Sequence, residues 1–199
     1  MDDSALPRAR RPVIDPSPWV QRWAGLIRPG GCVLDLACGS GRHLRWLAAQ
    51  GFSLTGVDRD AAALQELAGL GEVLAADLED GSPWPLPGRC FDAIVVTNYL
   101  WRPLWPQILG ALAEGGVLIY ETFGDSQASV GRPSRPEFLL RPGELLQLAA
   151  GLHVVAYEDG FLEPPPRFVQ RIAAVARPPP LARHPLDAAA AAGQLKSPA

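Results

Sequence analysis

Short apolar runs alternate with segments of helical periodicity along most of the chain. The apolar runs lie between glycines, prolines and charged residues, a pattern typical of strands buried on both faces of a parallel sheet. Five such runs follow in order: 32–38, 52–58, 73–77, 91–98 and 117–120. Between and around them, apolar residues recur every three or four positions, which predicts helices. The expected helices span 17–27, 42–50, 61–70, 104–113 and 143–150.

This alternation of strands and helices predicts the fold class. Successive strand–helix–strand units favour a parallel sheet with right-handed crossovers and helices on both faces. Two later strands, 153–157 and 168–176, are joined by a proline-rich, hairpin-like connection. We therefore expect an α/β fold with a doubly wound, mostly parallel seven-stranded sheet and an antiparallel C-terminal strand.

The chain is expected to contain one folded domain, 17–177. Residues 1–16 are polar and proline-containing and are expected to be mobile, and 178–199 read as a disordered tail. Within the domain, residues 124–142 break the rhythm of strands and helices. Because long connections at the ligand edge of a sheet often cover a site, this segment is expected to be a lid.

Composition narrows the class of protein. The chain has 199 residues, 48% of them hydrophobic, and a net charge of −3, which suits one α/β domain and argues against nucleic acid as a partner. No apolar run approaches the ~20 residues of a membrane-spanning helix, and the start lacks the apolar segment of a secretory signal. The three cysteines, Cys32, Cys38 and Cys90, have no ligand-like spacing and are expected to be buried hydrophobes. A cytoplasmic protein without a metal site is expected.

A glycine loop follows the first strand directly. Gly39 and Gly41 separate that strand from the next helix, an arrangement in which the backbone and the helix start can approach a ligand closely. Leu44 occupies the place of the third glycine of a dinucleotide fingerprint, which disfavours a nicotinamide-dependent reductase. A phosphate-binding P-loop is excluded because no Lys-Ser/Thr pair follows the glycines.

The run Asp35-Leu36-Ala37-Cys38-Gly39-Ser40-Gly41 resembles the first motif of the class I S-adenosyl-L-methionine (SAM)-dependent methyltransferases. The resemblance covers roughly 19–177 and implies SAM as the cofactor and methyl transfer as the reaction. A looser similarity, over 138–145 and 155–158, links the chain to bacterial tellurite-resistance-type methyltransferases. A protein that binds SAM or S-adenosylhomocysteine (SAH) without catalysis is the alternative in a different class.

Polar residues end four of the predicted strands, where ligands bind in such sheets: Asp58, Asp77, Asn98 and Glu121. The resemblance implies that Asp58 accepts hydrogen bonds from both ribose hydroxyls and that Asp77 accepts one from the adenine amine. It places Arg59 and the backbone of Leu78 beside adenine, and Asn98 near the methyl group. At the methionine end, the resemblance implies the following partners: Asp35, Ala37 and Gly39 for the ammonium, and the amides near Gly41 for the carboxylate.

Candidates for a general base are His43, Tyr99 and Glu121, needed only if the methyl acceptor must lose a proton. The family's fourth motif reads Thr97-Asn98-Tyr99-Leu100-Trp101 here, unlike the Asn/Asp-Pro-Pro-Tyr/Phe form that grips a planar amine. A small-molecule acceptor is therefore expected. Aromatic walls with the anionic Glu121 suit a partly apolar acceptor that bears a donor group or a positive charge.

Overall fold

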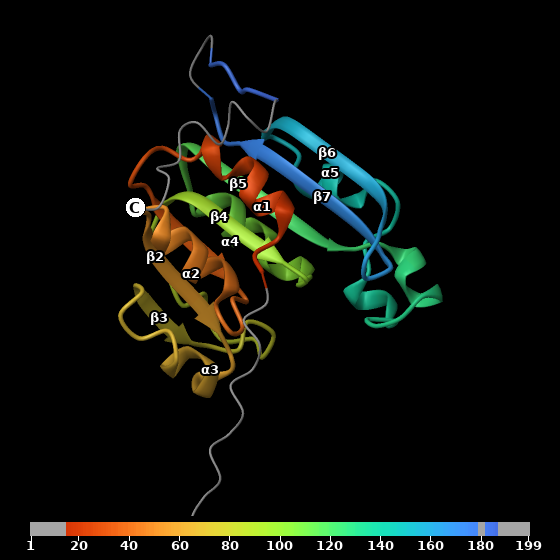
Figure 1. The fold of residues 1–199 in the computed structure, drawn as a ribbon, viewed down its shortest axis with the longest axis horizontal. Helices are drawn as coiled ribbons and strands as arrows, with labels where there is room; N and C mark the ends of the chain where they lie inside the picture. The colour runs from red at the N-terminus through yellow and green to blue at the C-terminus, as the bar shows by residue number, and fades with distance from the viewer. Residues whose placement is uncertain (1–14, 179–181, 187–199) are drawn as a thin grey trace, which may run out of the picture.

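The computed structural model describes residues 15–178 and 182–186 (Figure 1). Nearly all of the predicted mobile segment, 1–16, and most of the predicted tail, 178–199, lie outside the described residues. The described part is a sheet with helices on both faces. None of its helices has the length and apolar character needed to cross a membrane.

Within residues 15–178, seven strands form one sheet in the order β3-β2-β1-β4-β5-β7-β6. All neighbours pair in parallel except β7, which runs antiparallel to both β5 and β6. The predicted fold class is therefore confirmed. In sheet order the strands are β3 (Glu72–Ala75), β2 (Ser53–Asp58), β1 (Cys32–Leu36), β4 (Phe91–Thr97), β5 (Leu112–Phe123), β7 (Arg167–Val175) and β6 (His153–Leu162).

Two hydrophobic clusters, one on each face, hold the helices against the sheet. One face packs against α1 (Pro18–Trp23), α2 (Arg42–Ala49) and α3 (Ala61–Gln65). The other packs against α4 (Trp105–Gly110) and α5 (Glu144–Leu148). Short 3-10 helices complete the list: η1 (Ala24–Leu26), η2 (Arg102–Leu104), η3 (Asp125–Ser129) and η4 (Pro136–Phe138).

Several boundaries and burials differ from expectation. β5 begins at Leu112, inside the predicted helix 104–113, because Leu112 already pairs with Phe91 before a register shift. The burial predicted for the cysteines is wrong for two of the three: Cys32 starts β1 and is exposed, and Cys90 lies in the exposed loop before β4, whereas Cys38 is buried.

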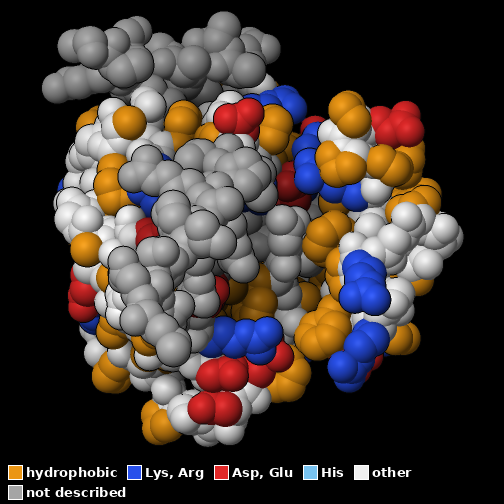
Figure 2. All heavy atoms as spheres, turned by 60° about the horizontal axis from the view of Figure 1, so that its bottom comes forward, with side chains coloured by type: hydrophobic (Ala, Val, Ile, Leu, Met, Phe, Trp, Pro, Cys, Tyr) orange, Lys and Arg blue, Asp and Glu red, His pale blue; other side chains and the backbone are white. Residues whose placement is uncertain are grey.

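The predicted lid is anchored at its base and exposed in its middle. Gly124 and Leu140 form a β-bridge, and the buried Gln127 accepts a hydrogen bond from the backbone N–H of Phe168 at 2.9 Å. Residues 128–132 and 134–137 are exposed. In Figure 2 the right-hand lobe, to which this segment belongs, is separated by a hollow from the rest of the surface.

Candidate functional site

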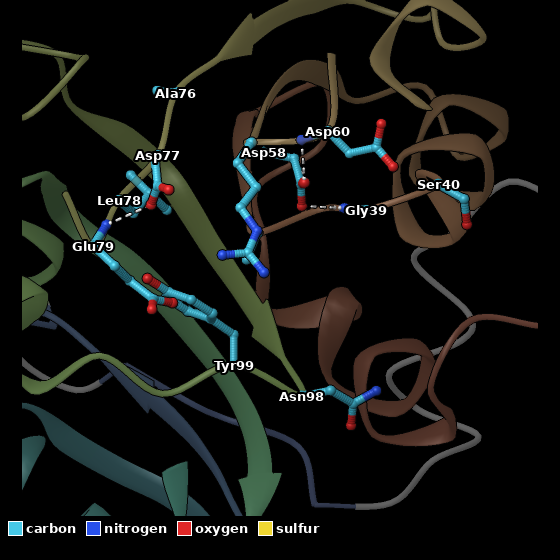
Figure 3. Close-up of a pocket in the computed structure, with 12 residues that line it drawn as sticks. Gly39, Ser40, Asp58, Asp60, Ala76, Asp77, Leu78, Glu79, Asn98 and Tyr99 are labelled. Carbon is cyan, nitrogen blue, oxygen red and sulfur yellow. Dashed lines mark hydrogen bonds between the residues drawn. The ribbon is translucent and has the colours of Figure 1, made fainter. Parts of the chain in front are cut away.

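A pocket of about 370 Å³ opens at the carboxyl ends of β1, β2, β3 and β4 (Figure 3). Seven of the nine predicted cofactor-binding residues line it: Ala37, Gly39, Asp58, Arg59, Asp77, Leu78 and Asn98. The predicted catalytic residue Tyr99 lines it as well. The pocket also includes four residues that the sequence did not single out for it: Ser40, Asp60, Ala76 and Glu79.

The carboxylate of Asp58 connects the two loops at the centre of this pocket. Its Oδ2 accepts the backbone N–H of Gly39 at 2.7 Å, and its Oδ1 accepts that of Asp60 at 2.9 Å (Figure 3). A carboxylate oxygen has two lone pairs, so each oxygen can accept one further hydrogen bond from a ligand. Asp58 therefore orders the glycine loop while keeping acceptor capacity on the pocket side.

The glycine loop has a left-handed backbone where it borders the pocket. The φ angles of Ala37 and Gly39 are 56° and 55°, and across the pocket Asn98 has φ 55°. Such angles are uncommon for residues other than glycine and tend to occur at ligand sites. A Cβ atom added to Gly39 would meet nothing within 4 Å, so space for a ligand lies directly above this residue.

Gly41 has a packing role at the start of α2. A Cβ atom there would lie 2.4 Å from Cδ2 of Leu67, so its absence lets the start of α2 pack closely. The Gly41 N–H donates to the carbonyl of Cys38 at 2.9 Å and closes the turn. Gly41 does not line the pocket, and its amide is not free for a cofactor carboxylate.

Carboxylates dominate the end of the pocket formed by β2 and β3. Asp77, whose Oδ1 accepts the N–H of Glu79 at 2.9 Å, lies opposite Asp58 (Figure 3), and Arg59 lines the same pocket. In Figure 2 acidic side chains gather beside a basic one at the lower edge of the view.

Tyr99 is a protonated phenol at neutral pH. Burial raises its pKa most, and the charges of Glu79 and Asp77 raise it further.

Asp35 and His43 form a buried pair beneath the glycine loop. The Asp35 side chain is 1% exposed, and burial raises its pKa to about 8 although the charge of Arg42 opposes that shift. Its Oδ2 finds no hydrogen-bond partner among residues 15–178, and His43 Nδ1 lies 3.9 Å away. His43 Nε2 accepts the N–H of Ser17 at 3.1 Å, and burial lowers the pKa of His43 to about 3. Both groups are mainly uncharged at pH 7 and neither lines the pocket.

Glu121 is also enclosed, under α1. Its side chain is 1% exposed, its Oε1 accepts the hydroxyl of Ser17 at 3.0 Å, and its Oε2 lies 3.4 Å from Nη1 of Arg171. Arg171 in turn lies over the Trp19 ring, 4.7 Å from the ring centroid, and pairs with Glu158. The predicted general base is thus a buried, ion-paired carboxylate. The catalytic roles of His43, Tyr99 and Glu121 stay predictions, and the geometry exposes none of the three as a free base.

Comparison with known proteins identifies the fold. Residues 33–116 match the family described as "Methyltransferase domain". TehB from Haemophilus influenzae superposes with a TM-score of 0.63 and 19% identity, over 77% of this chain and 60% of that one. A SAM-dependent methyltransferase from Methanosarcina mazei gives a TM-score of 0.62 and 18% identity, over 83% of this chain and 100% of that one.

A curated relative matches over a shorter stretch. The ribosomal RNA small subunit methyltransferase H of Nostoc sp. is 37% identical over 76 residues, which is 35% of this chain. The match spans only a quarter of the relative's length. The resemblance predicted from the sequence is confirmed, and the comparisons support SAM as the cofactor: residues 33–116 match the methyltransferase-domain family, and the fold is that of class I SAM-dependent methyltransferases.

Proposed function

We propose that this protein is a SAM-dependent methyltransferase that acts on a small-molecule acceptor. The observation that carries the proposal is the Asp58 carboxylate, which faces the pocket while holding the glycine loop by the Gly39 amide. A methyltransferase domain over 33–116 supports the same activity.

The pocket suits SAM in both shape and polarity. Asp58 would accept the ribose hydroxyls, and Asp77 would accept the adenine amine next to the Leu78 backbone; Arg59 would flank the ring. The open space above Gly39 would admit the methionine end, towards Asn98. Asp35 is separated from this space by burial, so an ammonium would interact with the Ala37 and Gly39 carbonyls rather than with Asp35 directly.

SAM supplies a methyl group already activated on a sulfonium. The protein's task is to hold a nucleophile about 3 Å from that methyl, in line with the breaking bond, and to exclude water. Tyr99, as a protonated phenol at the pocket wall, can donate a hydrogen bond to the acceptor but does not remove a proton from it. The proposed chemistry therefore relies on position, and favours acceptors that are nucleophilic without a protein base.

The small-molecule acceptor rests on the sequence after β4. Residues 97–101 lack the proline pair that grips a planar amine in base-methylating enzymes, and the predicted lid at 124–142 would close over a small compartment. The similarity to the ribosomal RNA enzyme covers too little of that protein to extend its substrate to this chain. A cytoplasmic location is part of the proposal, because three free cysteines fit a reducing compartment.

Melting temperatures with SAM, SAH and NADH test the proposal. A ligand at 100 times its dissociation constant stabilises the fold by about 2.7 kcal/mol, so SAM and SAH should raise the melting temperature and NADH should not. Transfer of labelled methyl from SAM to a panel of phenols, thiols, amines and carboxylic acids then separates an enzyme from a binding protein. A shift with NADH alone would contradict the proposal. SAH binding without transfer to any acceptor would favour the non-catalytic alternative.

A further inference from the structure

Arginines determine the charge at the carboxyl edge of the sheet beyond Asn98; this edge is called the rim. Glu121, the acid expected to face the acceptor there, is buried against Ser17 and Arg171. The other carboxylate of this cluster, Glu158, pairs with Arg171 and with Arg22. Both negative charges are thus already paired within the fold, and neither is left for an acceptor.

Arg42 brings a positive charge to the start of this region. It begins α2 directly after the glycine loop, and its guanidinium lies 3.4 Å from the Thr97 hydroxyl oxygen and 3.4 Å from the Asp15 carbonyl. Thr97 is the neighbour of the pocket residue Asn98. These contacts are long and involve neutral oxygens, so the charge of Arg42 is not compensated by them. Burial lowers the pKa of Arg42, the charges of Glu121 and Asp35 oppose that shift, and the nearby charge of Arg167 acts in the same direction as burial.

Arg167 brings a second positive charge from the opposite side. Because β7 is antiparallel, its first residue lies at the edge where the parallel strands end: Phe123, the last residue of β5, pairs with Val169. Side chains alternate along a strand, so Arg167 shares the face of Arg171, which is the face covered by α1 and α2. Its Nε is buried and has no hydrogen-bond partner in the described part of the chain.

Burying a guanidinium nitrogen without a hydrogen-bond acceptor costs folding free energy. A planar carboxylate is the group whose two oxygens best match a guanidinium. We propose that Arg42 and Arg167 form a carboxylate-binding subsite at the β4–β5–β7 rim, and that this subsite holds a carboxylate of the methyl acceptor. The inference rests on the proposed function. Of the two acceptors expected from the sequence, one with a donor group or one with a positive charge, it replaces the second by an acceptor with a negative charge. Tyr99 and Trp101, both half-buried, would pack against the acceptor's apolar part.

The methionine carboxylate of the cofactor is the other carboxylate that this subsite could bind. Arg42 lies on the glycine-loop side, whereas Arg167 lies on the far side of β4 and β5 from β1. The two sources therefore differ in what Arg167→Gln should do. If the acceptor supplies the carboxylate, this variant keeps its SAH affinity; if the cofactor supplies it, SAH affinity falls.

Calorimetric titration of SAH-saturated protein with matched acids and amides tests the inference. The probes are 4-hydroxybenzoate with 4-hydroxybenzamide, and indole-3-acetate with indole-3-acetamide. In at least one pair the acid should bind ~10-fold more tightly than its amide, because charge-assisted hydrogen bonds are about twice as strong as neutral ones. Arg167→Gln should remove that preference while its SAH affinity changes by less than about threefold.

The control is Arg45→Gln, which removes an arginine from α2, the helix that begins with Arg42. Arg45 donates to the carbonyl of Glu66, away from the rim, so the preference for acids should survive. A second measurement needs no variant: raising the salt concentration from about 0.05 to about 0.5 M should weaken binding of the acid and leave that of the amide unchanged.

Three results would overturn the inference. The first is a wild-type protein that binds SAH but shows no preference for either acid. The second is an Arg167→Gln variant that still prefers the acid, and the third is one that loses SAH affinity about 10-fold. Failure of the wild type to bind SAH at all would instead contradict the proposed function.

Discussion

The two ends of the rim use opposite charges for different purposes. At the β2–β3 end, four carboxylates and one arginine line the pocket, and two of the carboxylates accept backbone N–H groups from the adjoining loops. At the β4–β5–β7 end, the carboxylates are paired within the fold, and Arg42 and Arg167 form no ion pair with a described carboxylate.

The difference shows how one sheet edge can hold two ligands of different chemistry. Carboxylates that still have free lone pairs favour neutral donors such as hydroxyl and amino groups. Guanidinium groups without partners favour an anion. The acidic end therefore suits a nucleoside, and the basic end suits an acid, with Asn98 and Tyr99 between them. Each end can therefore be perturbed without changing the other.

The largest effect is expected from shortening the predicted lid. Replacing residues 128–135 by two glycines should abolish methyl transfer while SAH affinity stays within about threefold, because the exposed middle of 124–142 adjoins the basic end and not the nucleoside end. Single-turnover assays with labelled SAM and calorimetry with SAH measure the two. Surviving turnover, or lost SAH binding, would show that this segment is not a lid.

Glu121→Ala should cost about 3 kcal/mol of unfolding free energy, because it leaves the half-buried Arg171 and the Ser17 hydroxyl without this partner. Glu158→Ala is the matched control: it removes another carboxylate from Arg171, but one whose side chain is 44% exposed, and should cost less than about 1 kcal/mol. Urea denaturation of both variants provides the comparison. Equal losses of unfolding free energy in the two variants would mean that the buried Glu121 stabilises the fold no more than the exposed Glu158 does.

His43→Gln should remove an acid-sensitive contribution to stability. The pKa of His43 is lowered in the fold to about 3, so its contribution is complete above the unfolded pKa of about 6.5 and is lost as pH falls towards 3. Wild type should therefore lose on the order of 2 kcal/mol more than the variant between pH 7.5 and pH 4. Asp35, with its raised pKa, acts in the opposite direction in both proteins and cancels in the difference.

Urea denaturation at the two pH values measures this difference. The glutamine oxygen can replace Nε2 as acceptor for the Ser17 N–H, so the fold should persist. Parallel pH profiles for wild type and variant would contradict the burial of a neutral His43.

The smallest effect is expected from Asp77→Ala, which removes one proposed hydrogen bond to a neutral amine. SAH affinity should fall by about 3- to 10-fold. Asp80→Ala makes the same change of charge three residues later, outside the pocket, where Asp80 accepts the N–H of Ser82, and should alter affinity by less than about twofold. Equal losses of SAH affinity in the two variants would show that Asp77 acts only through its negative charge and forms no hydrogen bond with the cofactor.

The acidic end was largely predictable from the sequence, and the basic end was not. A residue at the end of a parallel strand must reach the ligand edge, so Asp58, Asp77 and Asn98 could be placed from the strand pattern alone. The same reasoning does not show what covers a residue. Glu121 and His43 lie at the predicted edge but are buried by Ser17 and α1, a contact between segments far apart in the chain.

Arg167 was missed for a topological reason. In an antiparallel strand the first residue, not the last, reaches the carboxyl edge of its parallel neighbours, whereas the predicted site residues of the sheet all follow from where strands end. The direction of β7 was predicted, so this residue could have been found by the same rule applied in reverse. Arg42 follows the glycine loop at the start of a helix, where its sequence position alone does not indicate the direction of the side chain.

The most direct test of the account is whether Asp58 contacts the ribose. Calorimetric titrations of wild type and Asp58→Ala with SAH and with its 2′-deoxyribose analogue separate that contact from the ordering of the glycine loop by the same carboxylate. A hydrogen bond to a charged group contributes about 1.5–3 kcal/mol, so wild type should bind SAH at least ~10-fold more tightly than the analogue. Asp58→Ala should bind both weakly and within about twofold of each other. A wild type that binds the two equally, or an Asp58→Ala variant that keeps the wild-type preference, would contradict the assignment of the acidic end to the nucleoside.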